Sequence, residues 1–215
     1  KGAESHMKYI DMPLAMWLIF AKSFRNNLTT VLGIEPAKAK EITKKAKRKY
    51  KEIIARIPEF EKKDRFKMNL VNCAMFSAFL LTLPTLPDVD AATEYYKKSM
   101  MTGLMEWFCR QSGKSQYSPS DIRGMQETAA LRAGERNPYS WNMDFREYED
   151  GSGYEAKFYT CGICTLMTEL GLKQLIPAMC RLDYSMSEAG GVTNFVREYT
   201  LASGGPYCDC GYKKR

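Results

Sequence analysis

The chain has 215 residues and a net charge of +7, and 45% of its residues are hydrophobic. These values are typical of a folded globular protein and exclude a chain that is disordered over most of its length. The length suffices for one sizeable domain, with or without a helical extension.

The only histidine, His6, lies just before Met7, in a segment that we interpret as a remnant of cloning, residues 1–6. A natural chain that starts at Met7 contains no histidine. Ser-His-Asp triads, Cys-His pairs and histidine-bound metals are then excluded. Proton transfer would have to use cysteine, aspartate, glutamate, lysine, tyrosine or water.

Helices are predicted for the N-terminal half, where apolar residues recur at spacings of three and four. The first runs from Pro13, which suits a first helical turn, to Gly33, which suits a stop. A second helix begins at Pro36 and ends near Ile57. Further helices are expected over Arg65–Leu83, from Asp88 or Asp90 to Arg110 with Tyr95, Met101, Leu104, Met105 and Phe108 facing inward, and from a cap at Ser120 or Asp121 to Ala133.

The pattern changes after Gly134. From Tyr139, large apolar and polar residues alternate on either side of Asp150–Gly153, which predicts a β-hairpin. Helices over Thr165–Leu170 and Pro177–Ala189 and strands over Asn194–Ala202 and Tyr207–Tyr212 are expected to follow. We therefore predict an α+β fold, in which an N-terminal helical bundle over residues 7–134 is followed by a small antiparallel sheet with two or three helices over residues 135–215, together in one compact unit.

Lysines concentrate in Lys38–Lys51. We interpret this run as the solvated face of a helix, because the interleaved aromatic residues of many RNA-binding segments are missing. The apolar run Met12–Ala21 is about half as long as the ~20 residues of a membrane helix. The odd cysteine count and the lack of a signal peptide favour a reducing cytoplasm. We expect a cytoplasmic protein that acts on a small molecule, without a cofactor, and without a nucleic acid or a membrane as its partner.

Five of the seven cysteines fall in the C-terminal third, with acids and an arginine at the ends of predicted segments. A hydrophobic core would normally use aliphatic residues at such positions. We therefore interpret these side chains as the lining of a site. The residues are Cys161, Cys164, Cys180, Cys208, Cys210, Glu169, Asp183, Glu188, Arg197 and the pair Gly204-Gly205.

The residues alone leave three other interpretations of the thiols open. A metal site built from Cys161-x-x-Cys164 and Cys208-x-Cys210 departs from the ordinary zinc pattern, in which roughly two to four residues separate paired cysteines. A redox pair at Cys161 and Cys164 lacks the surrounding Trp-Cys-Gly-Pro sequence and the βαβ context. The third alternative is a purely structural role for all five thiols. For the chain as a whole, a non-catalytic protein that binds a small molecule is the alternative to an enzyme.

Three motifs between Tyr154 and Asp209 resemble those of the L-2-amino-thiazoline-4-carboxylic acid hydrolase family. They are C-x-x-C-x-x-x-x-E-L-G, C-x-x-D-Y-x-M-x-E and the most specific one, R-x-x-T-L-A-x-G-G-x-x-C-D. The chain departs from the family at Cys210 and Gly211, where members usually carry an aromatic residue and an arginine. The positions that match are Cys161, Cys180, Asp183, Arg197, Thr200, Gly204, Gly205, Cys208 and Asp209.

The resemblance implies a hydrolase that opens a small, cyclic amidine-like ring. A cysteine thiolate would attack the electrophilic carbon of the ring, and water would hydrolyse the covalent intermediate. The candidate nucleophiles are Cys161, just before a predicted helix N-terminus that lowers a thiol pKa, and Cys208. Asp183 or Glu169 would serve as the general base.

The other motif residues are expected to bind the substrate. Arg197 would pair with a substrate carboxylate in a bidentate manner, and Gly204-Gly205 would let backbone N–H groups approach an anion. Alternatively, Arg197 forms a structural ion pair with Asp183 or Glu198, and the two glycines form only a tight turn. The predicted substrate-binding set is Arg197, Thr200, Gly204, Gly205, Asp209 and Cys180.

Overall fold

The protein is described from a computed structural model, which defines the backbone of residues 7–58 and 66–215 and the side chains of residues 12–58 and 66–215. The chain forms two compact units. One holds the chain up to Met100 together with Leu166–Ala178, and the other holds Met101–Thr165 and Met179–Arg215. The expected division into residues 7–134 and 135–215 stays a prediction, because a grouping of contacts does not measure independent folding.

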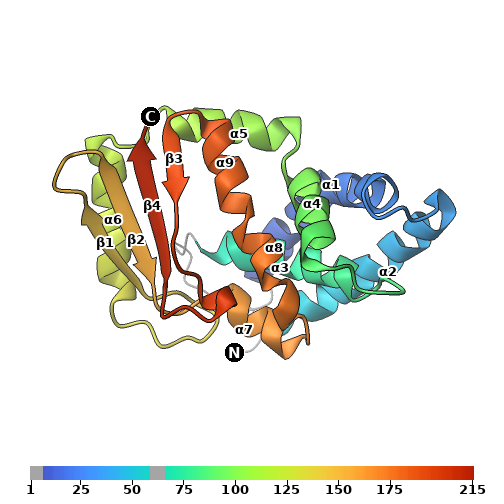
Figure 1. Cartoon of the computed structure of the whole chain (residues 1–215). Coiled ribbons are helices and arrows are strands. Elements are labelled where there is room, and N and C mark those ends of the chain that lie inside the picture. Colours follow the sequence, from blue (N-terminus) through green and yellow to red (C-terminus); the bar gives the residue numbers. More distant parts are fainter. Residues whose placement is uncertain (1–6, 59–65) are drawn as a thin grey trace. The chain divides into compact units, whose positions relative to one another are not determined.

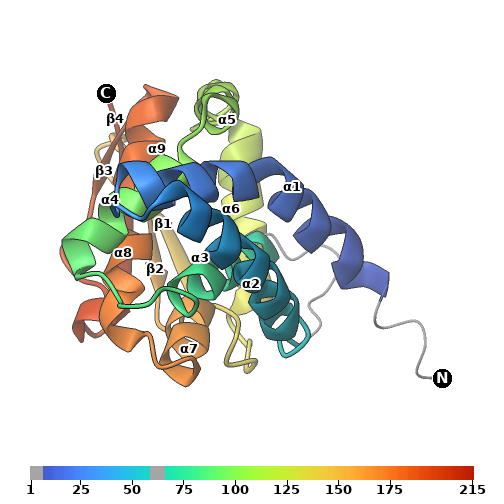
Figure 2. The same ribbon diagram turned by 90° about the vertical axis from the view of Figure 1, so that its right-hand side faces the viewer.

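The first unit is built from helices α1 (Met7–Thr30), α2 (Pro36–Ile54), α3 (Lys67–Leu80) and α4 (Val89–Met100). Both α1 and α2 contact α3, and they cross in front of it in Figure 2. Most residues of α3 are buried, as expected for a central helix that is apolar on all sides.

Aromatic rings form much of this unit's core. The rings of Phe24 and Phe79 stack with centroids 5.0 Å apart, and Tyr95 meets Phe24 edge-on at 5.6 Å. The Tyr95 hydroxyl donates a hydrogen bond to the carbonyl oxygen of Phe24 at 3.2 Å, so its buried polar end has a partner. The core therefore ties α1 to both α3 and α4.

Helix α2 explains the lysine run. Its buried residues recur at spacings of three and four, while Lys38 and Lys45 both pair with Glu41 on the exposed side, at 2.9 and 2.7 Å. Exposed pairs of this kind add little stability, typically about 0.3–0.5 kcal/mol each. The buried stripe consists of Ala39, Ile42, Ala46, Tyr50 and Ile53.

Two sequence predictions about the limits of these helices are wrong. Helix α1 begins before Pro13, which lies inside it. A proline removes a backbone donor but does not always end a helix. The expected helix from Asp88 to Arg110 is broken after Met100, because Thr102 caps a new helix, α5 (Gly103–Gly113), by accepting a hydrogen bond from Met105 N at 3.4 Å. Asp88 does cap α4, as expected, by accepting from Ala91 N at 2.8 Å.

The break changes which side chains face inward. Leu104 and Phe108, both predicted to be inside, are each 56% exposed on α5. The next helix, α6 (Pro119–Arg132), is capped by Ser118 rather than by Ser120 or Asp121, because the Ser118 hydroxyl accepts from Asp121 N at 3.2 Å.

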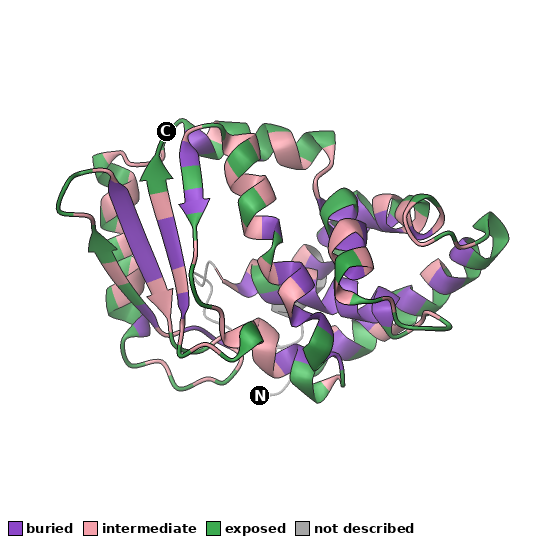
Figure 3. Ribbon diagram, in the orientation of Figure 1, coloured by how far each residue is buried: buried purple, intermediate pink, exposed green. Residues whose placement is uncertain are grey.

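The second unit contains a four-stranded antiparallel sheet with the strand order β1-β2-β4-β3 (Figure 1). Its strands are β1 (Met143–Glu147), β2 (Gly153–Phe158), β3 (Thr193–Val196) and β4 (Cys208–Lys214). Helix α6 contacts β1, and helix α9 (Leu182–Gly190) contacts β3. Figure 3 shows buried residues along β2, the strand between β1 and β4.

The predicted hairpin is present, with its turn at Asp150–Gly153. The remaining short elements are α7 (Gly162–Glu169), the 3-10 helix η1 (Lys173–Leu175), α8 (Ile176–Cys180) and the 3-10 helix η2 (Leu201–Ser203). The helix predicted over Pro177–Ala189 is thus divided between α8 and α9. The strand predicted over Asn194–Ala202 ends at Val196, where the chain leaves the sheet.

The fold is α+β, as the sequence predicts, with N-terminal helices followed by a small antiparallel sheet. Within the described ranges, no helix combines the length and the apolar character that crossing a membrane requires.

Two glycines of the hairpin allow a matched test of this sheet. Gly153 has φ +149° and an added Cβ would collide with the Tyr212 carbonyl oxygen in β4, whereas Gly151, with φ +68°, has open space around it. We expect Gly151→Ala to cost about 1–2 kcal/mol, from backbone strain alone. Gly153→Ala should cost clearly more, because β2 must also move away from β4. Thermal unfolding of both variants measures this, and equal losses would contradict the close approach.

Candidate active site

Cys161 lies at the N-terminal end of α7, three residues after Phe158, the last β2 residue of the β1–β2 ladder. Its carbonyl oxygen accepts from Thr165 N at 3.2 Å, so the residue acts as the N-cap of the helix. Its sulfur receives hydrogen bonds from the Cys164 side chain, the backbone N–H groups of Cys164 and Ile163, and the Trp141 side chain. The side chain is partly exposed. Donors from the Cys164 side chain, the helix backbone and Trp141 therefore meet at one sulfur.

These donors favour the thiolate. The hydrogen bond from Cys164, supported by the N–H groups of the helix end and by Trp141, lowers the pKa of Cys161 to about 7, against the opposing effect of burial. The same interaction, together with burial, raises the pKa of the Cys164 thiol. Cys164 thus acts as the donor of the pair and Cys161 as the acceptor.

The loop between α6 and β1 packs against this helix end. An added Cβ at Gly162 would collide with the Tyr139 carbonyl oxygen and would lie 3.1 Å from a ring carbon of Trp141. The Thr165 hydroxyl donates to the Pro138 carbonyl oxygen at 2.6 Å. A glycine after Cys161 is therefore required by the approach of the loop, which also brings Trp141 to the sulfur.

Sequence analysis missed Trp141. It lies 20 positions before Cys161, in a segment that reads as the start of a strand, and tryptophan is more often a core residue than a hydrogen-bond donor to a reactive group. Its indole N–H is the feature that could have drawn notice, since a buried donor requires a partner.

Arg197 gathers a second group of side chains. Its Nη2 donates to Asp183 Oδ2 at 2.5 Å and to Cys210 Sγ at 3.0 Å, and its Nη1 donates to the Cys180 carbonyl oxygen at 3.0 Å. The guanidinium also lies 4.7 Å from the centre of the Phe195 ring. Its side chain is 6% exposed, against 43% for that of Asp183. The ion pair with Asp183 is the structural pairing that the sequence left open.

This pairing limits how Arg197 can bind a substrate. Both terminal nitrogens already have protein partners, while the buried Nε has no hydrogen-bond partner. A bidentate contact to a carboxylate would require one of these partners to leave. Of its five N–H donors, the one on Nε and one on Nη1 remain for a further acceptor.

The other thiols lie within electrostatic reach of Cys161 but are more strongly disfavoured as thiolates. Burial raises the pKa of Cys180 and Cys208, and raises that of Cys210 to about 12. The Cys208 sulfur accepts from Leu201 N at 3.2 Å. Cys208 and Cys210 share one face of β4 and pack with Phe195. The interacting group comprises Cys161, Cys164, Cys180, Cys208, Cys210, Asp183 and Arg197.

Two predicted acids lie elsewhere or act locally. Glu169 is exposed at the C-terminal end of α7 and belongs to the other compact unit. Asp209 accepts hydrogen bonds from Glu198 N at 2.9 Å and Tyr199 N at 2.6 Å. Its carboxylate therefore holds the chain where it leaves β3, next to Arg197.

The glycine turn also uses its own donors. Gly204 has φ +82° and ends η2, with its N–H bonded to the Leu201 carbonyl oxygen at 3.2 Å. The N–H of Gly205 donates to the Thr200 carbonyl oxygen at 2.9 Å, and Thr200 Oγ1 accepts from Ser203 N at 3.1 Å. This is the tight turn that the sequence left as an alternative. Anion binding by the two glycines stays a prediction.

Within residues 7–58 and 66–215, no three side chains of His, Cys, Asp or Glu form a group that could hold a metal ion. A cavity of about 80 Å³ in this unit has a different lining from the thiol group. It is lined by Tyr117, Ile122, Glu147, Tyr148, Gly151, Gly153, Tyr154 and Lys214.

A family model described as L-2-amino-thiazoline-4-carboxylic acid hydrolase matches residues 87–212, which is more than half of the chain. The matched range contains every thiol of the group around Cys161, together with Asp183 and Arg197. No curated protein and no solved structure matches the chain.

The donors around Cys161 predict selective alkylation. Below about pH 7 the Cys161 thiol is mostly protonated, and above it the thiolate predominates, so its reaction with iodoacetamide should be half-maximal near pH 7. Cys210, buried and with a pKa of about 12, should stay unmodified across the same range. Peptide mass spectrometry on the native protein would measure both.

The Cys164 side chain provides the control. Cys164→Ala removes the strongest donor and should move the midpoint for Cys161 towards the ordinary thiol value of about 8.5. Cys164→Ser keeps a hydroxyl donor and should move it less. A midpoint near the ordinary value in the unaltered protein would contradict the arrangement.

Proposed function

This chain belongs to the L-2-amino-thiazoline-4-carboxylic acid hydrolase family, and from that membership we infer that it hydrolyses a small cyclic amidine of the thiazoline type. The observation that supports the inference most directly is the set of hydrogen bonds that the sulfur of the half-buried residue Cys161 receives from Cys164, Ile163 and Trp141. A ring carbon bonded to nitrogen and sulfur is electrophilic, and a thiolate is the nucleophile suited to it.

We derive the following sequence of steps. The Cys161 thiolate adds to the amidine carbon, and the π electron pair of the C=N bond moves to nitrogen. That nitrogen takes one proton on addition and a second as its bond to the carbon breaks, and it leaves as an amine while a lone pair of a neighbouring heteroatom restores a double bond to the carbon. These two protons are balanced by the two that the attacking water gives up in the next step. Water adds to the carbon that remains bound to Cys161, and the carbon–sulfur bond to Cys161 breaks, which regenerates the thiolate. One water is consumed per ring opened, and no oxidant or reductant takes part.

The choice between the two candidate nucleophiles rests on burial and hydrogen bonding. Cys208 is 8% exposed, and burial raises its pKa, whereas Cys161 is more accessible and its pKa is lowered. A nucleophile must be both ionised and reachable. We therefore assign the covalent step to Cys161 and a packing role to Cys208.

Asp183 is the carboxylate that we assign to proton transfer. Its side chain is partly exposed, and its charge acts on Cys180 and Cys208. Arg197 holds it through Oδ2. In this role Asp183 would take a proton from the attacking water. In a chain without a catalytic histidine, a group other than imidazole must accept this proton. The role of Glu169 as the general base stays a prediction.

The substrate is expected to differ from that of typical family members. An arginine in place of Gly211 would not fit, because even a Cβ there would lie 2.6 Å from both the Tyr148 hydroxyl and a Val196 methyl group. If the usual arginine binds a carboxylate, this chain has only the remaining N–H groups of Arg197, on Nε and Nη1, among the motif cations for that purpose. A substrate with one weakly held acidic group, or none, fits this arrangement best.

Ring opening by purified protein tests the proposal. Incubation with L-2-amino-thiazoline-4-carboxylate and a panel of uncharged thiazolines and cyclic amidines, followed by mass spectrometry, should give a product that is heavier by one water. Cys161→Ser should lower kcat by about a thousandfold, as expected when a covalent nucleophile is lost. Cys208→Ser should retain most activity.

Different outcomes would reject the covalent mechanism, the choice of nucleophile or the activity itself. Unchanged turnover by Cys161→Ser would remove the covalent mechanism, and loss of turnover in Cys208→Ser alone would reverse the assignment. No product from any member of the panel would reject the activity itself. Elemental analysis of the same sample checks the four-cysteine alternative, because a filled site would show about one metal per chain.

A further inference from the structure

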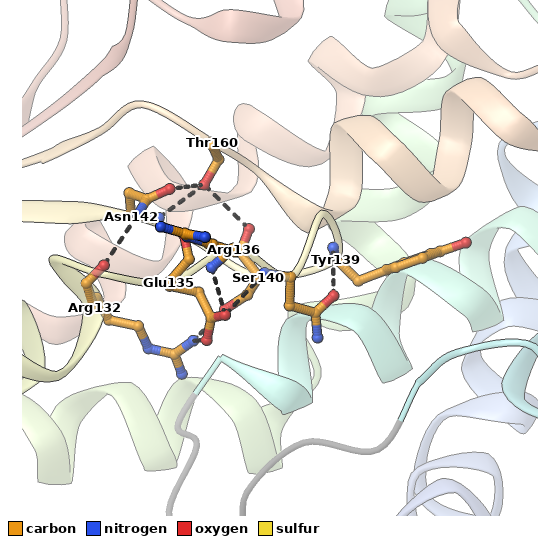
Figure 4. Close-up of polar contacts among 8 residues, drawn as sticks. Arg132, Glu135, Arg136, Tyr139, Ser140, Asn142 and Thr160 are labelled. Atoms are coloured by element: carbon orange, nitrogen blue, oxygen red, sulfur yellow. Dashed lines mark hydrogen bonds and ion pairs between the residues drawn. The ribbon is translucent and has the colours of Figure 1, made fainter.

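A buried arginine outside the thiol group lies at the base of the loop that carries Trp141. Arg132 is the last residue of α6 and is 6% exposed. Its Nη1 donates to the Ser140 hydroxyl and lies 3.4 Å from Glu135 Oε2. A buried guanidinium requires such partners, since an unpaired buried charge is costly. Figure 4 shows Arg132, Glu135 and Ser140 meeting beneath the loop.

Asn142 extends the network from this arginine to the residue before Cys161. Its Nδ2 donates to the carbonyl oxygens of Arg132 and Glu135, both at 3.0 Å. Its backbone N–H donates to Thr160 Oγ1 at 2.8 Å, and the Thr160 hydroxyl donates to Asn142 Oδ1 at 3.0 Å. The end of α6 is thus linked through two residues to the backbone that leads into Cys161.

Glu135 also fixes the interior of the loop. Glu135 Oε1 accepts from the backbone N–H groups of Arg136 and Asn137, each at 2.8 Å, and Asn137 Oδ1 accepts from Tyr139 N at 3.0 Å. These bonds set the direction of the Tyr139 carbonyl, which is the group that approaches Gly162. Polar contacts thus link Arg132 to Tyr139, and the Tyr139 carbonyl oxygen lies close against Gly162 in the first turn of α7.

We propose that Arg132 is a positioning residue for Cys161, because it fixes the loop that holds Trp141 and the Tyr139 carbonyl against the first turn of α7. The importance of this role for turnover rests on the proposed function, whereas the effect on the sulfur itself does not. The side-chain contacts of Arg132 described above are with Ser140 and Glu135. Arg132 acts by keeping the Trp141 donor and the two helix N–H groups in place around Cys161.

The test measures the reactivity of Cys161 rather than turnover. In Arg132→Met, the loop should lose its anchor, and alkylation of Cys161 by iodoacetamide at about pH 6 should fall roughly tenfold for each unit by which the thiol pKa rises. Arg132→Lys keeps the charge but not the fork of donors, and should restore part of the rate. Arg123 is an exposed arginine on the same helix, so Arg123→Met should leave the rate of Cys161 alkylation unchanged.

Thr160→Val serves as the second variant, in case Arg132→Met does not fold. Thr160 is exposed, and valine has nearly its shape but lacks the oxygen that links it to Asn142. It should also shift the Cys161 pH profile upward, by less than Arg132→Met. A thermal melt of each variant confirms that the fold is kept.

An unchanged pH profile for Cys161 in folded Arg132→Met, or in Thr160→Val, would overturn the proposal and leave Arg132 with a purely structural role. A shifted profile in a protein that opens none of the amidines would support the positioning role while rejecting the proposed function. The two ideas therefore fail under different observations.

Discussion

The arrangement of the site depends on the hydrogen bonds that the first turn of α7 donates to the Cys161 sulfur. A helix end carries unsatisfied N–H groups, and a sulfur that caps them is stabilised as an anion. Here a thiol from within the helix and an indole from a distant loop add to the same acceptor. The close fit of the loop at Gly162 follows from this, because any side chain there would push Trp141 away.

The thiols differ in how readily they ionise because hydrogen bonding and burial differ among them. Cys161 is stabilised by donors, whereas Cys208 and Cys210 lie on one face of β4 in an apolar cluster and are kept protonated by burial. Arg197 connects that strand to Asp183 and uses its strongest donors in doing so. Chemically similar side chains thus differ in role because their surroundings differ, a contrast that is typical of functional sites.

The sequence predicts the fold class well and its junctions less well. Spacing identifies the buried stripe of α2, and Asp150–Gly153 identifies the hairpin, because both patterns are local. The break at Thr102 is missed, since a threonine within an apolar run is an equally good helix residue until its side chain caps. In the site, the cysteines and the Asp183–Arg197 pair could be proposed from motifs. The part played by Trp141 could not, because it depends on how a loop returns to a helix.

The filled space around Gly211 limits which side chains this position can accommodate. Val196 and the Tyr148 hydroxyl lie where a longer side chain at that position would begin. A longer side chain there would require smaller residues at Val196 or Tyr148, and either of these replacements alone would leave a cavity in the sheet. An arginine at this position therefore requires that Tyr148 or Val196 also give way.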